Sequence, residues 1–269
     1  MLGKGNSQSK VVDMAGVMQF LIESVSAFYI GHSLVGTTLP GMMQGLLEEP
    51  VEMQILNGAP LEWQWKEAHH AQGVNGREWL PDHAVDALVI TERVPLAPAM
   101  EYHDSLGYAA KWVELARQSN PGVKPYLYQT WDYIDPDSTR PWRDRILADL
   151  PQWQSIADHV NLDLPEGAEP MRLVPVGLGM VRLHDAAEAG KVPGATSIRD
   201  FFGDDIHPTE QGGSYYIAMI HYATLTGKSP VGLTNRIPGG SGPYPLVPKE
   251  QAAVLQELAW QVVQEFAAD

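Results

Sequence analysis

Five short apolar segments, each bounded by turn-forming residues, constrain the fold of this chain more than any other feature of its sequence. Their length suits strands rather than helices, and most of them show little alternation between apolar and polar residues. Strands of this kind are buried on both faces, which is typical of a parallel sheet covered by helices. The sequence therefore predicts an α/β fold, a three-layer α/β/α sandwich around a five-stranded parallel sheet, with strands at 26–31, 51–56, 86–90, 123–129 and 171–177.

The stretches between and after these segments repeat apolar residues with the period of a helix. We expect crossover helices at 106–116 and 146–160, and two further helices packed on the sheet at 215–225 and 253–266. The segment between the last two, 227–248, is rich in Gly and Pro, which disfavour helix and strand interiors. This irregular segment is expected to wrap around or cover the functional site.

Composition and charge narrow the class of protein. No linker interrupts the pattern, so residues 1–269 are expected to form one domain. The formal net charge of −15, from 33 acidic and 18 basic residues, argues against nucleic-acid binding and favours neutral or cationic substrates. The chain has no cysteine, which excludes disulfides and thiolate catalysis, and no apolar run long enough to span a membrane. We expect a soluble protein that is cytoplasmic, or that is periplasmic or secreted if a leader was removed. The sequence does not specify its oligomeric state.

A serine follows the first predicted strand, in the sequence Gly-His-Ser-Leu-Val-Gly of residues 31–36. Ligands of open parallel sheets bind at the carboxyl ends of strands, so Ser33 is a candidate nucleophile. Two other motifs fit poorly, since Thr37 stands where a phosphate-binding loop needs lysine and Val35 stands where a G-x-S-x-G elbow needs glycine. A plain strand-to-helix turn with Ser33 as a helix cap is the structural alternative.

An acid and a base near the C-terminus strengthen the case for Ser33 as a nucleophile. Asp204 precedes His207 by three residues, and Pro208 follows. A turn can bring the carboxylate to one imidazole nitrogen while the other takes a proton from a serine hydroxyl. We expect Pro208 at the first position of a helix that holds His207 rigidly. The alternative is a surface histidine near a helix start, but the chain order Ser, Asp, His favours nucleophilic catalysis.

With these residues in place, the sequence resembles the SGNH or GDSL-like hydrolases, a family of serine esterases and lipase-like enzymes. Residues 31–35 are similar to the family's first block, with His32 in place of the usual aspartate, and residues 203–218 are similar to its last block. The resemblance implies a flavodoxin-like sheet and an acyl-enzyme on Ser33, with Asp204 and His207 as the acid and base. It also implies short acyl or acetyl esters, carbohydrate esters among them, as substrates, with no cofactor and no metal.

The same resemblance implies an oxyanion hole made by the Ser33 amide, a glycine after the second strand and an asparagine after the third. Gly58 is our candidate for the glycine, with Gly73 and Gly76 as alternatives, and a turn glycine without a catalytic role is equally compatible. The asparagine block is missing, and residues 91–95 stand there instead. Either Arg93 or another donor substitutes, or the protein is a weak or inactive member of the fold that binds a glycan or a protein partner.

Other constellations in the sequence are weaker. Trp131, after the fourth strand, either lines a sugar or acyl pocket or packs in the core. Several acidic residues and histidines offer metal ligands, but none shows a recognised metal-binding spacing, so we expect solvated side chains. They are Glu67, His69, His70, Asp82, His83, His103 and Asp104.

Overall fold

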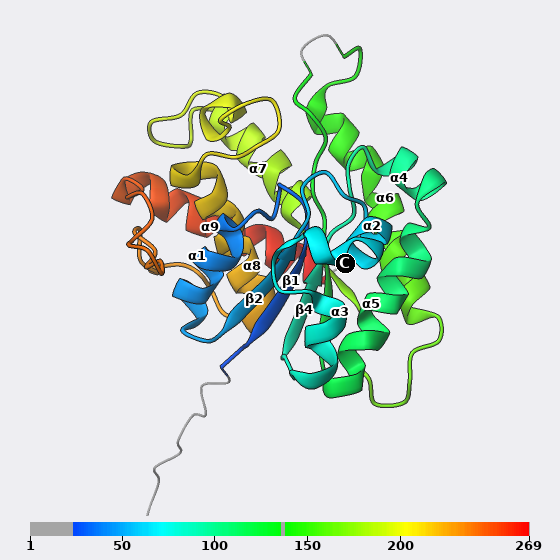
Figure 1. Ribbon diagram of the computed structural model, residues 1–269. Helices are drawn as coiled ribbons and strands as arrows, with labels where there is room; N and C mark the ends of the chain where they lie inside the picture. The colour runs from blue at the N-terminus through cyan, green and yellow to red at the C-terminus, as the bar shows by residue number, and fades with distance from the viewer. Residues whose placement is uncertain (1–23, 136–137, 269) are drawn as a thin grey trace, which may run out of the picture.

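The structure is a computed structural model that describes residues 24–135 and 138–268. A sheet in the order β3-β2-β1-β4-β5-β6 crosses the middle of the molecule (Figure 1). Five strands are parallel and confirm the predicted flavodoxin-like sheet, while β3 adds an antiparallel edge of two residues that the sequence analysis did not predict. Two exposed residues are too few to leave a periodic pattern. The strands are β1 (Ala27–Gly31), β2 (Val51–Ile55), β3 (Gln72–Gly73), β4 (Ala87–Ile90), β5 (Lys124–Tyr128) and β6 (Arg172–Val174).

Helices cover both faces of the sheet, as expected of a three-layer α/β/α sandwich. The four helices predicted from their apolar period correspond to α5, α6, α8 and α9. The helices are α1 (Thr38–Leu47), α2 (Leu61–Lys66), α3 (Gly76–Trp79), α4 (Leu96–Tyr102), α5 (Ser105–Ser119), α6 (Trp142–Asn161), α7 (Val176–Glu188), α8 (Tyr215–Thr226) and α9 (Lys249–Ala268). None of them is long and apolar enough to cross a membrane in the part of the chain that the structure describes.

Successive side chains of the central strands enter two separate apolar cores. Tyr29 and Val89 point into the core under α1, α7, α8 and α9, whereas Phe28 and Ile30 point into the core under α2, α4, α5 and most of α6. All four side chains are fully buried. Burial on both faces explains why these strands lack the polar alternation of a half-exposed sheet.

The loops after β1 and β4 lead to opposite faces of the sheet, and this places the candidate site. Helix α1 follows β1 on one face, whereas α4 and α5 follow β4 on the other. Because β1 pairs with both β2 and β4, the loops at the carboxyl ends of β1 and β4 diverge at one point of the sheet edge. Such a divergence forms the crevice where open α/β sheets bind ligands.

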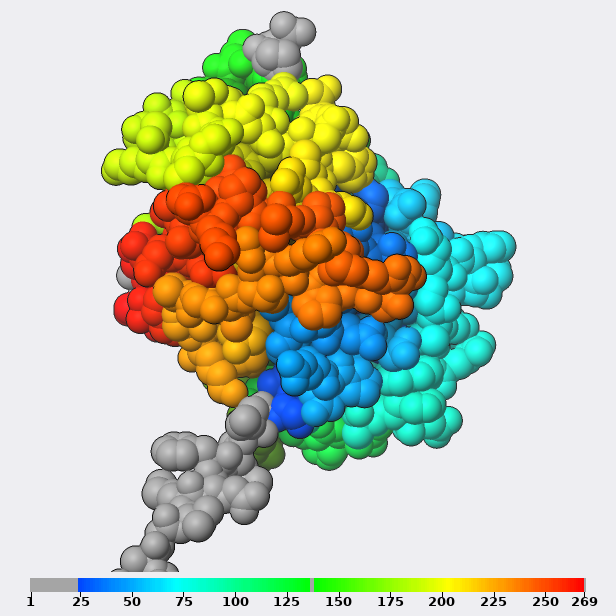
Figure 2. All heavy atoms as spheres, turned by 90° about the vertical axis from the view of Figure 1, so that its left-hand side faces the viewer, coloured from blue at the N-terminus to red at the C-terminus, as the bar shows by residue number. Residues whose placement is uncertain are grey.

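The irregular segment 227–248 does not cover that crevice, so this expectation was wrong. It contains neither helix nor strand and runs as a band across the face that carries α1 (Figure 2). Ile237 and Val247 are buried in the α1-side core, and a side chain at Gly45 of α1 would collide with the Pro238 carbonyl oxygen at 2.2 Å. Burial of these apolar side chains holds the segment against α1.

Candidate active site

Ser33 lies in a small pocket at the carboxyl edge of the sheet, where the sequence analysis places the site. Loops that follow β1, β2, β4 and β5 meet there with the segment that carries His207. The pocket has a volume of about 310 Å³ and is lined by His32, Ser33, Leu34, Gly58, Arg93, Val94, Pro95, Tyr133, Ile206 and His207.

The loop after β1, residues 31–36, is held by close packing and by its own backbone. A methyl group at Gly31 would lie 2.6 Å from Val35 Cγ2 and 2.8 Å from Thr91 Cγ2, so only glycine lets the β1 and β4 loops approach this closely. The backbone N–H groups of Val35 and Gly36 both donate to the His32 carbonyl oxygen, at 2.9 and 3.0 Å. These amides are therefore not turned outward as a phosphate-binding loop requires.

The structure brings together the serine, histidine and aspartate that the sequence analysis singled out. Ser33 Oγ lies 2.9 Å from His207 Nε2, and His207 Nδ1 lies 2.7 Å from an Asp204 carboxylate oxygen. With the proton on Nδ1 bonded to Asp204, Nε2 is free to accept the Ser33 hydroxyl proton. The arrangement meets the geometric requirement for a serine activated by general base catalysis.

The Asp204 carboxylate is stabilised in its ionised form by hydrogen bonds from Ile206 and His207, two and three residues further along the chain. One oxygen accepts the backbone N–H groups of His207 at 2.6 Å and Ile206 at 2.8 Å, and the other accepts the His207 ring. The backbone hydrogen bond from His207, then its ring and the amide of Ile206, lower the pKa of Asp204 to about 2. The Asp204 carboxylate is therefore ionised near neutral pH.

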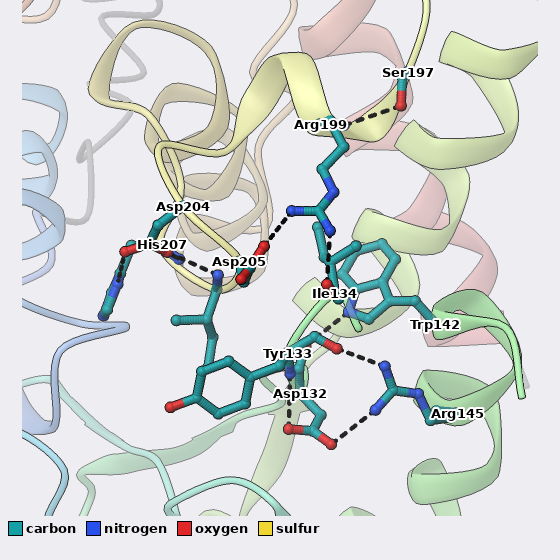
Figure 3. A network of polar contacts seen from close by, with 11 residues as sticks. Asp132, Tyr133, Ile134, Trp142, Arg145, Ser197, Arg199, Asp204, Asp205 and His207 are labelled. Atoms are coloured by element: carbon teal, nitrogen blue, oxygen red, sulfur yellow. Dashed lines mark hydrogen bonds and ion pairs between the residues drawn. The ribbon is translucent and has the colours of Figure 1, made fainter. Parts of the chain in front are cut away.

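The segment that carries Asp204 and His207 is clamped to the loop after β5 (Figure 3). The backbone N–H of Ile134 donates to the Asp205 carbonyl oxygen at 2.7 Å. Trp131 Nε1 donates to the Ile206 carbonyl oxygen at 3.0 Å. Arg199 joins the two segments, because its guanidinium donates to the Asp205 carboxylate at 2.5 Å and to the Ile134 carbonyl oxygen at 2.7 Å. These hydrogen bonds fix the backbone on both sides of His207, although the loop that carries it is exposed.

Pro208 does not occupy the first position of a helix, contrary to our expectation. It pairs with Phe202 in a short β-bridge, and the N–H of Thr209 donates to the Phe201 carbonyl oxygen at 2.8 Å. This pairing keeps Pro208 extended, so helical structure begins two residues later with a π-helical turn, Glu210–Ser214, that leads into α8. His207 is anchored by this pairing rather than by a helix start.

The two backbone N–H groups that the sequence analysis names for the oxyanion hole are available to a substrate oxygen. Neither the N–H of Ser33 nor that of Gly58 has a hydrogen-bond partner within the described ranges. Gly58 has a φ of 70°, a conformation that favours glycine. Of the two alternatives, Gly73 belongs to β3 and Gly76 donates its N–H to Gln54 Oε1 at 2.8 Å, and neither lines the pocket.

His32, which replaces the aspartate of the resembled family, has a structural position behind Ser33. It is buried, its Nε2 lies 3.0 Å from the Glu92 carbonyl oxygen, and its Nδ1 accepts the N–H of Leu34 at 3.4 Å. Burial lowers the pKa of His32 to about 4, so the ring is neutral near pH 7 and acts as a spacer between the β1 and β4 loops. It is the wall of the pocket rather than a second base.

Aromatic residues after β5 differ from what the sequence suggested. Trp131 is 1% exposed and supports Ile206 from below, so it is a core residue and does not line the pocket. Tyr133 lines the pocket instead and is 50% exposed. Sequence reasoning did not single out Tyr133, and its place shortly after the fourth parallel strand was the available signal.

The candidate metal ligands lie away from Ser33. Glu67, His69 and His70 form an exposed group whose ligand atoms lie within 4.8 Å of one another, and no residue of this group lines the pocket. His83 is bonded to the Trp79 carbonyl oxygen, and His103 to the Glu62 carboxylate.

Comparison with known proteins leaves the chain without an assigned family. No family model matches the chain, and no curated protein matches it. A solved structure that it resembles is the crystal structure of a carbohydrate esterase family 3 from Talaromyces cellulolyticus, with 14% sequence identity and a TM-score of 0.44. The match covers 73% of this chain and 94% of that chain. Fold and site together define an α/β/α sandwich with a Ser-His-Asp hydrogen-bonded chain at its carboxyl edge.

Proposed function

We propose that this protein is a serine ester hydrolase with Ser33 as its nucleophile. The observation that carries the proposal is the pair of contacts at His207, 2.9 Å to Ser33 Oγ and 2.7 Å to the Asp204 carboxylate. A hydroxyl, an imidazole and a carboxylate in this order are the parts of a catalytic triad, whatever the fold that holds them. The SGNH-like sequence blocks around Ser33 and His207 agree with this assignment.

In the proposed mechanism, Ser33 Oγ attacks the carbonyl carbon of the ester while His207 Nε2 takes its proton. The carbonyl oxygen becomes an oxyanion and accepts the free N–H groups of Ser33 and Gly58. The tetrahedral intermediate collapses, His207 returns the proton to the leaving alcohol, and the acyl group stays on Ser33. Water then attacks the acyl carbon while His207 takes its proton, the bond from that carbon to Ser33 Oγ breaks, and His207 returns the proton to Oγ as the acid leaves. Asp204 stabilises the imidazolium in both halves.

The size and lining of the pocket support short acyl groups, acetyl included, as substrates. A volume of about 310 Å³ is at the lower end of the range for small-molecule sites. The half-exposed Tyr133 ring at its rim offers an apolar face to the alcohol part of the ester, and a sugar ring is the class of alcohol that we propose for it.

A fluorophosphonate probe tests the proposal directly. We expect one adduct per chain on the intact protein, located on Ser33 by peptide mass spectrometry, and no adduct in Ser33→Ala. Ser229→Ala is the matched control, because Ser229 lies in the irregular segment and its hydroxyl serves only the local N–H of Val231. A folded wild-type protein that neither reacts with the probe nor hydrolyses p-nitrophenyl esters of two to eight carbons would refute the proposal and would favour a glycan- or protein-binding member of the fold.

A further inference from the structure

One cation in the proposed active-site pocket has no partner. Arg93, on the loop after β4, lines the pocket together with Ser33, Gly58 and His207. No hydrogen bond or ion pair joins its guanidinium to any residue that the structure describes. Arg143, Arg145 and Arg199, in contrast, all bind carboxylates. A free guanidinium in a chain of net charge −15 is a donor available for a ligand.

Several other polar groups of the same loop already have partners. The backbone N–H of Arg93 donates to the Glu92 carboxylate at 2.6 Å, and the Thr91 hydroxyl donates to the Tyr128 carbonyl oxygen at 2.8 Å. The Glu92 carbonyl oxygen faces His32, and Pro95 has no N–H. Among residues 91–95, the Arg93 guanidinium is therefore the side-chain donor that has no partner in the described part of the chain.

Glu92 fixes the peptide from which that side chain starts. Its carboxylate is fully buried and also accepts the backbone N–H of Leu61 at 3.2 Å, at the start of α2. This hydrogen bond ties the β4 loop to the segment that carries Gly58, three residues before Leu61. Ser33, Gly58 and Arg93 thus project from three loops that are joined to one another beneath the pocket.

We propose that the Arg93 guanidinium is the third donor to the oxyanion. The inference rests on the proposed ester hydrolysis. As the Ser33 Oγ–carbon bond forms, the π-electron pair of the carbonyl moves to its oxygen, and the guanidinium binds that oxygen beside the N–H groups of Ser33 and Gly58. Arg93 retains its own protons throughout, because a guanidinium does not deprotonate in proteins. A fixed cation placed where negative charge develops stabilises the transition state more than the neutral ester.

The test compares Arg93→Ala, Arg93→Gln and Arg93→Lys on a neutral ester, p-nitrophenyl acetate, and on an anionic one, mono-p-nitrophenyl succinate. We expect Arg93→Ala to lower kcat by roughly a hundredfold or more on both esters, with KM changed much less, because the lost contact exists only in the transition state. Gln and Lys keep a donor and should recover at least part of the loss. Arg236→Ala, an exposed arginine of the irregular segment, should change neither constant.

Two results would overturn the inference while leaving ester hydrolysis intact. A loss restricted to the anionic ester, seen mainly in KM, would show that Arg93 binds a carboxylate of the substrate instead. Unchanged kcat in Arg93→Ala on both esters would show that it binds neither. If Arg93→Ala does not fold, as judged by circular dichroism and urea unfolding, the Gln and Lys variants decide the question by the same two criteria. A wild type without labelling at Ser33 would instead remove the proposed function itself.

Discussion

The two loops that meet at the candidate site are held by different physical means. The nucleophile loop, residues 31–36, is positioned by close packing around Gly31 and by turn hydrogen bonds to His32. The acid–base loop, residues 202–208, is exposed at Asp204 and half exposed at His207, and it is positioned by hydrogen bonds. Packing tolerates no added volume, whereas a hydrogen-bonded loop tolerates substitution but loses its alignment. Added volume in the first loop should therefore cost stability, and loss of a hydrogen bond in the second should cost activity.

The largest effect is expected from Asp204→Asn in the acid–base loop. Asparagine retains an oxygen for the two backbone N–H groups, but its amide places a donor against His207 Nδ1 and cannot stabilise the imidazolium. We expect kcat to fall by about 10⁴-fold, equivalent to ~5 kcal/mol of transition-state stabilisation, with p-nitrophenyl acetate as substrate. The exposed Asp158→Asn on α6 is the control and should keep wild-type kcat.

The same variant should show a difference in the pH dependence of stability. The pKa of Asp204 is about 2 in the folded protein, below its ordinary value of 3.8. Its stabilising contribution is therefore complete above pH 4 and is lost as the pH falls toward 2. Urea unfolding at several pH values should show a smaller loss of stability on acidification for Asp204→Asn than for wild type, and an equal loss would contradict the hydrogen bonds described for this carboxylate.

A smaller effect, of opposite kind, is expected from Gly31→Ala in the nucleophile loop. The added methyl group collides with Val35 and Thr91, so we expect the free energy of unfolding to fall by about 1–3 kcal/mol in urea denaturation. Gly240→Ala is the matched control, since a methyl group there meets no atom within 4 Å. Equal stability of the two variants would show that packing does not hold the nucleophile loop.

The smallest effect is expected from Arg199→Ala, which removes the clamp between the acid–base loop and Ile134. Arg199 would act by positioning the acid–base loop, so we expect its replacement to lower kcat roughly tenfold with KM nearly unchanged. The free energy of unfolding should change by less than ~1 kcal/mol. Arg143→Ala removes a comparable surface arginine that binds Asp185 through two hydrogen bonds far from Ser33. The free energy of unfolding of Arg143→Ala should change as little as that of Arg199→Ala, and its kcat should stay at the wild-type value. Equal kcat values in the two variants would show that the hydrogen bonds of Arg199 do not contribute to catalysis.

Much of the fold, and the three residues that meet at the candidate site, could be predicted from local sequence signals. Apolar strands such as 26–31 show their burial in composition alone, because a strand covered on both faces has no polar positions. Ser33 follows such a strand directly, and Asp204 lies within one turn of His207. Ser33 lies where a parallel strand ends, whereas His207 lies on the segment between α7 and α8, so the expectation that they meet rested on the chain order Ser, Asp, His.

The remaining features depend on which residues lie opposite each other in space. Neither the two-residue strand β3 nor the extended pairing of Pro208 with Phe202 has a periodic pattern of its own. The irregular segment 227–248 packs against α1 because buried apolar side chains find their core there, and its composition could not specify the partner. Arg93 and Tyr133 can be recognised as candidate site residues only because they line the same pocket as Ser33. Sequence thus determined the strands, helices and reactive groups, whereas the tertiary structure decided their neighbours, because non-local contacts leave no local trace in the sequence.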